Sequence, residues 1–113
     1  MKLVDTGITV RELRSMAEAR FGDLVKAVVD VRRGTMAVDA ELHSDEEAAL
    51  LATGSQQQDL WGINLYPDLP PSEWVEFDSM INIRPSSGNR SRGVDDPQVR
   101  AGIIAIVSSL VHE

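Results

Sequence analysis

A loop with the composition of an anion-binding segment spans residues 85–95 and leads into a predicted helix that begins after Asp96. The loop contains two glycines and three serines, together with Asn89, Arg90 and Arg92. Backbone N–H groups, hydroxyls and guanidinium groups supply the donors that a carboxylate or phosphate requires. The loop lacks the Gly-Lys-Ser/Thr of a P-loop, and acidic residues at the helix start compete with an incoming anion. The sequence therefore predicts either an anion-binding loop here or ion pairs between the loop and the rest of the chain.

Alternating side chains in the predicted strands place a second set of polar groups on one face of a sheet. If Trp61, Ile63 and Leu65 are buried, Asn64 and Tyr66 point the other way. We expect this face to carry no helix and to serve as a recognition surface or dimer contact, with an ordinary half-solvated sheet face as the alternative. The same alternation turns Asp78, Asn82 and Arg84 outward. The candidate binding residues are therefore Asn64, Tyr66, Asp78, Asn82, Arg84, Asn89, Arg90 and Arg92.

Glu41 and His43 lie two residues apart, so in an extended chain their side chains share a face. A carboxylate beside an imidazole suits metal binding or proton transfer. However, His112 is the only other histidine, there is no cysteine, and none of the ten serines lies in a Gly-x-Ser-x-Gly motif. We therefore expect no metal site and no cofactor, assign no catalytic residue, and keep Glu41 and His43 as weaker candidates.

Charge is distributed in blocks along the 113 residues, whose net charge is −7. Residues 34–83 carry ten acidic side chains and no lysine or arginine, after which basic residues return at Arg84, Arg90, Arg92 and Arg100. We expect these late arginines to pair with the acidic block or to bind an anion. An acidic chain repels a phosphate backbone, so nucleic-acid binding is not expected. Without a long apolar stretch for a membrane span or signal peptide, we expect a cytoplasmic protein.

The elements that position these groups follow from periodicity and capping signals. Thr9 and Glu12 form a capping box that opens a helix ending near Phe21. Residues 25–31 and 36–40 alternate as a hairpin around Gly34. Ser44 predicts the N-cap of a helix over 45–53. Further strands are predicted over 60–66 and 74–84, and a strongly apolar helix follows Asp96 and Pro97.

The predicted order is α-β-β-α-β-β-α, with a short additional strand possible at Leu3 and Val4. Antiparallel hairpins with helices on one side make a two-layer α+β fold. We expect a four-stranded antiparallel sheet with its helices mainly on one face, formed by residues 1–113 as one domain.

Four segments of the chain carry a family resemblance: GDLVKAVVDV, ELHSDEEA, DLWGINLYP and, most specifically, EFDSMINIRPSSGNRSRGV. The chain resembles a family of small bacterial and archaeal proteins known only as a domain of unknown function. The resemblance runs from about Ile8 to Val107. It implies a prokaryotic source but no activity, cofactor or site residue.

Two hypotheses for function follow from the residues. The first is a non-enzymatic binding module, a homodimer, that engages a protein or a small anionic ligand through the polar sheet face and the arginine-rich loop. The second is a small hydrolase or transferase acting on a phosphorylated or carboxylated substrate. In that case Arg90 and Arg92 clamp the anion, Glu41 or Asp78 is the base, and His43 assists, so these groups must converge on one pocket.

Overall fold

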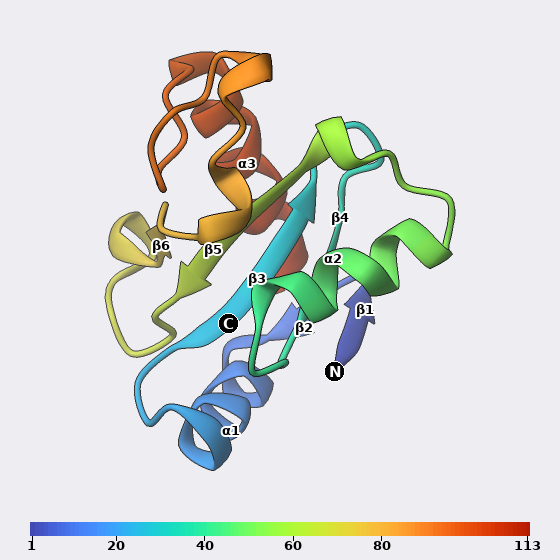
Figure 1. The fold of residues 1–113 in the computed structure, drawn as a ribbon. Coiled ribbons are helices and arrows are strands. Elements are labelled where there is room, and N and C mark those ends of the chain that lie inside the picture. Colours follow the sequence, from blue (N-terminus) through green and yellow to red (C-terminus); the bar gives the residue numbers. More distant parts are fainter.

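The computed structural model describes residues 1–113 as an α+β fold built on a five-stranded antiparallel sheet (Figure 1). The strands lie in the order β1-β4-β3-β5-β6. They span Lys2–Val4 (β1), Val25–Asp30 (β3), Thr35–Val38 (β4), Leu60–Leu65 (β5) and Val75–Glu76 (β6). A separate parallel pair joins β2 (Ile8–Thr9) to β7 (Val111–His112) near the chain ends. The α+β class is confirmed, but the sheet has five strands rather than four because β1 pairs with β4.

Helices α1 (Val10–Arg20) and α3 (Pro97–Leu110) cover one face of the sheet. Their apolar stripes enclose the main core with the inward residues of the strands, among them Met36, Trp61 and Ile63. The caps predicted for both helices are confirmed, since Thr9 accepts from the N–H of Glu12 and Asp96 accepts from that of Gln98. No helix is both long and apolar enough to span a membrane.

The third helix, α2 (His43–Ala52), lies on the opposite face of the sheet (Figure 1). Its Leu50 packs on Val28, Ala37 and Leu60 in a second, smaller apolar cluster. The expectation of a face without a helix is therefore wrong. The reason is that these three strand residues are apolar although they occupy the outward phase of their strands, so they need a cover of their own.

The predicted hairpin of β3 and β4 is confirmed, with Gly34 at a φ of +69° in the turn. Helix α2 begins two residues before the predicted start. Its N-cap is Leu42, which has no side-chain cap bond, and Ser44 lies inside the first turn. The prediction that Ser44 caps this helix is wrong.

The strand predicted over 74–84 is mostly wrong, because only Val75–Glu76 pairs with β5. The chain then turns through two short 3-10 helices, η3 (Met80–Asn82) and η4 (Pro85–Ser87). Ser79 caps the first by accepting from the N–H of Ile81. Other 3-10 turns are η1 (Gln57–Asp59) and η2 (Pro71–Glu73). As a consequence, Asn82 is buried instead of lying on an open face.

Candidate functional site

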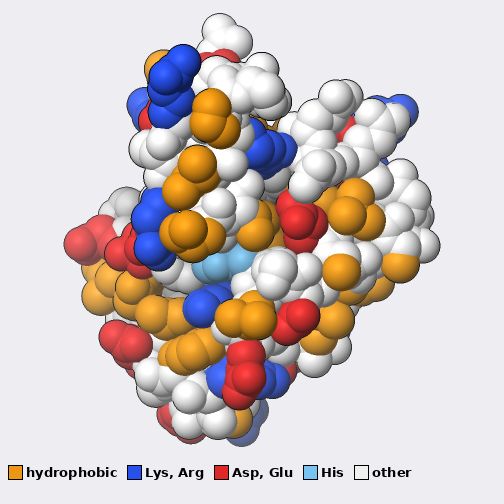
Figure 2. Space-filling view, in the orientation of Figure 1, with side chains coloured by type: hydrophobic (Ala, Val, Ile, Leu, Met, Phe, Trp, Pro, Cys, Tyr) orange, Lys and Arg blue, Asp and Glu red, His pale blue; other side chains and the backbone are white.

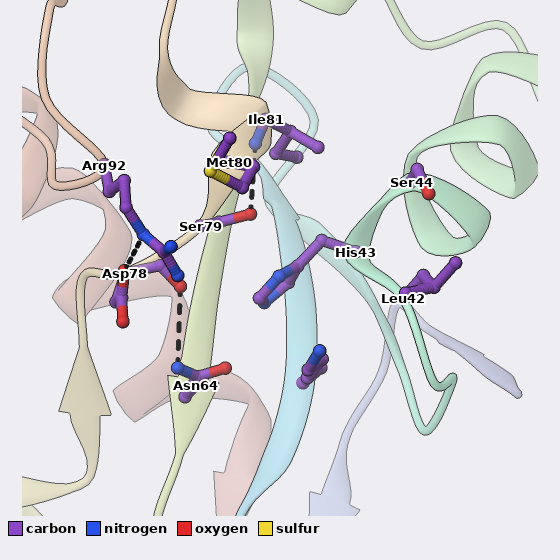
Figure 3. A pocket seen from close by; sticks show the side chains of 10 residues that line it. Leu42, His43, Ser44, Asn64, Asp78, Ser79, Met80, Ile81 and Arg92 are labelled. Carbon is purple, nitrogen blue, oxygen red and sulfur yellow. Dashed lines mark hydrogen bonds and ion pairs between the residues drawn. The ribbon is translucent and has the colours of Figure 1, made fainter.

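A cavity of about 220 Å³ opens on the α2 face of the sheet, between the first turn of α2 and the segment that follows β6 (Figure 3). The space-filling view shows a hollow on this face with a histidine at its base and hydrophobic side chains around it (Figure 2). Its apolar lining consists of Leu42, Met80 and Ile81. Its polar lining consists of Lys26, His43, Ser44, Asn64, Asp78, Ser79 and Arg92.

Lys26 of β3 and Asn64 of β5 are register partners that both line the cavity. Asn64 lies between Ile63 and Leu65, which point into the main core, so alternation turns its carboxamide toward α2. Lys26 lies between two core residues in the same way. Its ammonium lies 5.0 Å from the centre of the Phe21 ring and forms none of the ion pairs of the chain. Its positive charge therefore has no carboxylate partner.

Only one end of the Asn64 carboxamide forms hydrogen bonds. Its Nδ2 donates to Oε1 of Glu76 at 2.8 Å and to the carbonyl of Asp78 at 3.5 Å. Because a carboxylate only accepts, Glu76 fixes which end of the amide is the nitrogen. The opposite atom, Oδ1, is buried and has no hydrogen-bond partner. Asn64 is 7% exposed, and its oxygen points to the side of the cavity where His43 lies (Figure 3).

His43, the first residue of α2, lies over the sheet with its Nε2 at 2.7 Å from the carbonyl oxygen of Ile63. A carbonyl only accepts, so Nε2 carries the hydrogen and Nδ1 of the neutral ring holds a lone pair. Burial lowers the pKa of His43, an effect that the bond to Ile63 opposes and the charge of Lys26 reinforces. The imidazole is therefore neutral at pH 7, with one nitrogen fixed by the backbone.

Arg92 and Asp78 form an ion pair at the mouth of the cavity, with Nε at 2.6 Å from Oδ1 (Figure 3). Both side chains are half-exposed, and the terminal nitrogens of the guanidinium form no other hydrogen bond in the protein. The charged groups of the lining are thus Lys26, Arg92 and Asp78, and His43 is neutral. Their sum is a single positive charge in a chain whose net charge is −7.

The first turn of α2 also lines the cavity through Leu42, His43 and Ser44. The first N–H groups of a helix have no partner inside the helix, and Leu42 offers no side chain to cap them. The positive end of the helix dipole lies here as well. Asp45 in the same turn offsets part of that field. The helix start therefore adds donors to the cavity edge but little net positive potential.

Two buried asparagines hold the segment that forms the wall opposite α2. Asn82 bonds both backbone groups of Gly62 and donates to the carbonyl of Arg92 at 3.0 Å. Asn89 donates to the carbonyls of Asn82 and Gly93 at 2.7 and 2.9 Å. Both amides are fully engaged with the backbone. They position the cavity wall and do not line the cavity.

Arg84 lies on the sheet beside Trp61, with its guanidinium carbon 4.3 Å from the centre of the ring. It donates to the carbonyl of Gln57 at 2.7 Å and to that of Leu60. Burial lowers the pKa of Arg84, an effect that the charge of Glu47 opposes. The expected pairing of the late arginines with the acidic block therefore holds for Arg92 but not for Arg84, which binds backbone carbonyls.

The other three candidate residues lie outside the cavity lining. Tyr66 donates to Glu76 at 2.9 Å, and burial together with this bond raises the pKa of Tyr66 to about 12. Arg90 contributes only its backbone N–H, to Asp95. Glu41 is mostly exposed and lies 4.0 Å from a nitrogen of an arginine in α1.

Of the residues singled out in the sequence, the cavity brings together four: Asn64, Asp78, Arg92 and His43. Sequence reasoning missed Lys26, Ser44 and Ser79. Lys26 could have been found, because it occupies the outward phase of a well-predicted strand, the same phase that turns Asn64 toward this face from β5. The sequence pattern predicts Ser44 as a helix cap and Ser79 as part of a strand. No cluster of three or more histidine, aspartate or glutamate side chains is present that could hold a metal ion.

The model of a family described as "Protein of unknown function (DUF5674)" matches residues 2–110. The match covers nearly the whole chain, so the chain belongs to this family, and the family expected from the sequence is confirmed. Comparisons with curated proteins and with solved structures gave no match.

Proposed function

For this DUF5674 member, we propose a non-enzymatic binding function in which the cavity between α2 and η3 holds a small anion. The observation that carries the proposal is the charge of the lining, where Lys26 and Arg92 face a single carboxylate, Asp78. Arginine and lysine are the side chains that bind carboxylates and phosphates. A ligand of opposite charge would compensate the ammonium of Lys26, which has no ion-pair partner in the chain.

The size of the cavity supports a small ligand over a protein segment. A volume of about 220 Å³ is below the range of roughly 300–1,000 Å³ that is typical of sites for drug-sized molecules. The hydroxyls of Ser44 and Ser79 and the N–H groups at the start of α2 add neutral donors around it. The binding site that we propose is therefore a cavity beside the first turn of α2, and not the open sheet face expected from the sequence.

Thermal unfolding with added anions tests this function. The probes are sodium phosphate, sodium sulfate and sodium 4-methylpentanoate at constant ionic strength. We expect at least one of them to raise the Tm, since a ligand at 100 times its Kd stabilises a fold by about 2.7 kcal/mol. Lys26→Gln and Arg92→Gln should abolish most of this shift.

Arg90→Gln is the matched control, because Arg90 has the same charge but does not line the cavity. It should keep the parental shift. The proposal is wrong if no anion raises the Tm of the parent protein. It is also wrong if Arg92→Gln and Arg90→Gln respond alike.

A hydrolase or transferase is the second candidate, and the convergence of His43, Asp78 and Arg92 on one cavity favours it. The neutral imidazole with a lone pair on Nδ1 suits acid–base chemistry. Two features count against it. Asp78 is engaged by Arg92 at 2.6 Å, and the other proposed catalytic groups, Arg90 and Glu41, lie outside the cavity.

The enzymatic candidate predicts turnover of p-nitrophenyl phosphate or p-nitrophenyl acetate that is lost in His43→Gln and kept in Glu41→Gln. Equal turnover in both variants, or none in the parent, contradicts it. The expected homodimer stays a separate prediction, and light scattering of the purified protein would test it.

A further inference from the structure

The cavity contains a buried hydrogen-bond acceptor that has no donor and that the proposed function does not explain. Oδ1 of Asn64 is buried and unpartnered, while Nδ2 of the same amide is held by the carboxylate of Glu76. An amide flip would place the NH2 group away from Glu76 and bring two acceptors together, so the orientation is fixed. A buried acceptor of this kind is normally satisfied by a donor from the protein, from water or from a ligand. Asn64 lines the cavity, so a ligand bound there is the candidate source of the missing donor.

The net charge of the lining further limits the chemical class of the ligand. Lys26 and Arg92 against Asp78 leave one positive charge, so a ligand with one negative charge brings the cavity to neutrality. A zwitterion would leave the positive charge uncompensated and would add an ammonium near two cations. A sulfate dianion exceeds the balance and carries no donor for Asn64. The fitting donor is therefore a neutral hydroxyl.

The mouth of the cavity is apolar on the side of α2 and η3. Leu42 and Met80 are 54% and 64% exposed, and Ile81 is the third apolar residue of the lining. Exposed apolar side chains around a polar cavity suit a ligand that has an apolar group at the end opposite its charge. The volume limits that group to a short chain.

We propose that the ligand is a small hydroxycarboxylate with a short aliphatic chain. Its carboxylate lies with Lys26 and Arg92, its hydroxyl donates to Oδ1 of Asn64, and its aliphatic chain lies against Leu42 and Met80. This inference rests on the proposed function, since it names the class of anion that the same cavity binds.

A set of three acids with one carbon skeleton tests the inference. They are 2-hydroxy-4-methylpentanoate, leucine and 4-methylpentanoate, which differ only in a hydroxyl, an ammonium or a hydrogen at one carbon. The Kd values are measured by isothermal titration calorimetry with the full chain. For at least one enantiomer of the hydroxy acid, the Kd should be at least about tenfold lower than the Kd of 4-methylpentanoate. Leucine should bind more weakly than the hydroxy acid.

Asn64→Leu removes the acceptor at similar volume and should reduce the preference for the hydroxy acid to about equal binding. Should this variant fail to fold, the ratio measured in the parent protein decides alone. Equal binding of the hydroxy acid and 4-methylpentanoate by the parent overturns the inference and leaves the proposed function standing. Tighter binding of leucine also overturns it. If neither acid binds, and phosphate and sulfate fail as well, the proposed function itself is wrong.

Discussion

The side-chain amide of Asn82 forms with Gly62 the two hydrogen bonds that a neighbouring strand would form. The N–H of Gly62 donates to Oδ1 at 2.8 Å, and Nδ2 donates to the carbonyl of Gly62 at 2.9 Å. Strand β6 has already ended at Glu76, so this amide completes the edge of β5 where backbone pairing stops. The two hydrogen bonds hold η3 against the sheet. Because η3 contributes Met80 and Ile81 to the cavity, they also position its apolar wall.

We expect Asn82→Ala to lower the free energy of unfolding by about 3 kcal/mol, because it leaves two buried backbone groups of Gly62 without partners. Urea unfolding measures the change. Gln58→Ala, a change at an exposed amide, should stay within about 0.5 kcal/mol of the parent. Equal effects of the two substitutions would contradict the structural role given to Asn82.

The roles of Asn82 and Asn89 show where sequence reasoning reached its limit. An asparagine that binds a ligand and one that replaces a strand look the same in a sequence. The distinction depends on where β6 ends, and alternation between residues 75 and 83 favoured a strand that continues. In the structure only Val75 and Glu76 of this segment lie in a strand, and Ile81 lies on a turn of 3-10 helix. The contacts that fix those turns join residues about ten to twenty positions apart, such as Asn82 with Gly62 and Arg92.

Elements with strong local signals were predictable. The hairpin of β3 and β4 alternates regularly around Gly34, and the caps at Thr9 and Asp96 involve neighbours in the sequence. The site was partly predictable for the same reason, since the phase of β5 placed Asn64 correctly on the face opposite the main core. That α2 covers this face depended on Leu50 packing across the sheet, which no local pattern reveals.

Gly62→Ala and Gly102→Ala should change stability in opposite directions. A Cβ at Gly62 would lie 2.5 Å from both Cβ and Oγ of the buried Ser79, whereas one at Gly102 in α3 meets no atom within 4 Å. We expect Gly62→Ala to destabilise the fold by about 1–3 kcal/mol and Gly102→Ala to stabilise it by roughly 0.5–1 kcal/mol.

Thermal melts of the two glycine variants give the sign of each change in stability. Adding Ser79→Gly to Gly62→Ala removes the atoms in conflict and should recover part of the loss. The recovery is incomplete because Ser79 also accepts from the N–H of Ile81. A double variant no more stable than Gly62→Ala would show that the conflict lies elsewhere.

Arg84→Lys should destabilise the fold more than Arg92→Lys, although both keep the charge. The guanidinium of Arg84 donates to two carbonyls and stacks on Trp61, and an ammonium can reproduce neither the fork nor the stack. We expect a loss of about 1–2 kcal/mol. The Arg92 pair with Asp78 is half-exposed, so its lysine variant should stay within about 0.5 kcal/mol of the parent. Chemical unfolding of both variants checks this order, and the reverse order would contradict it.

Glu46 gives the fold a stability that decreases as the pH rises. Its side chain is fully buried in α2, where Oε2 accepts from the N–H of Ala40 at 3.2 Å and Oε1 has no partner. Burial raises the pKa of Glu46 from 4.5 to about 9, although that bond and the charge of Lys26 oppose the shift. Between these two values the folded protein keeps a proton that the unfolded chain has released. The contribution is complete below pH 4.5 and is lost as the pH rises through about 9, with a slope of about 1 kcal/mol per pH unit.

We therefore expect Glu46→Gln, which cannot ionise, to flatten the decline in the free energy of unfolding between about pH 6 and pH 9. Urea unfolding at successive pH values measures the slope. Glu18→Gln makes the same change on the exposed face of α1 and should keep the parental slope. If Glu46→Gln and Glu18→Gln have the same slope, Glu46 does not hold a proton in the folded protein.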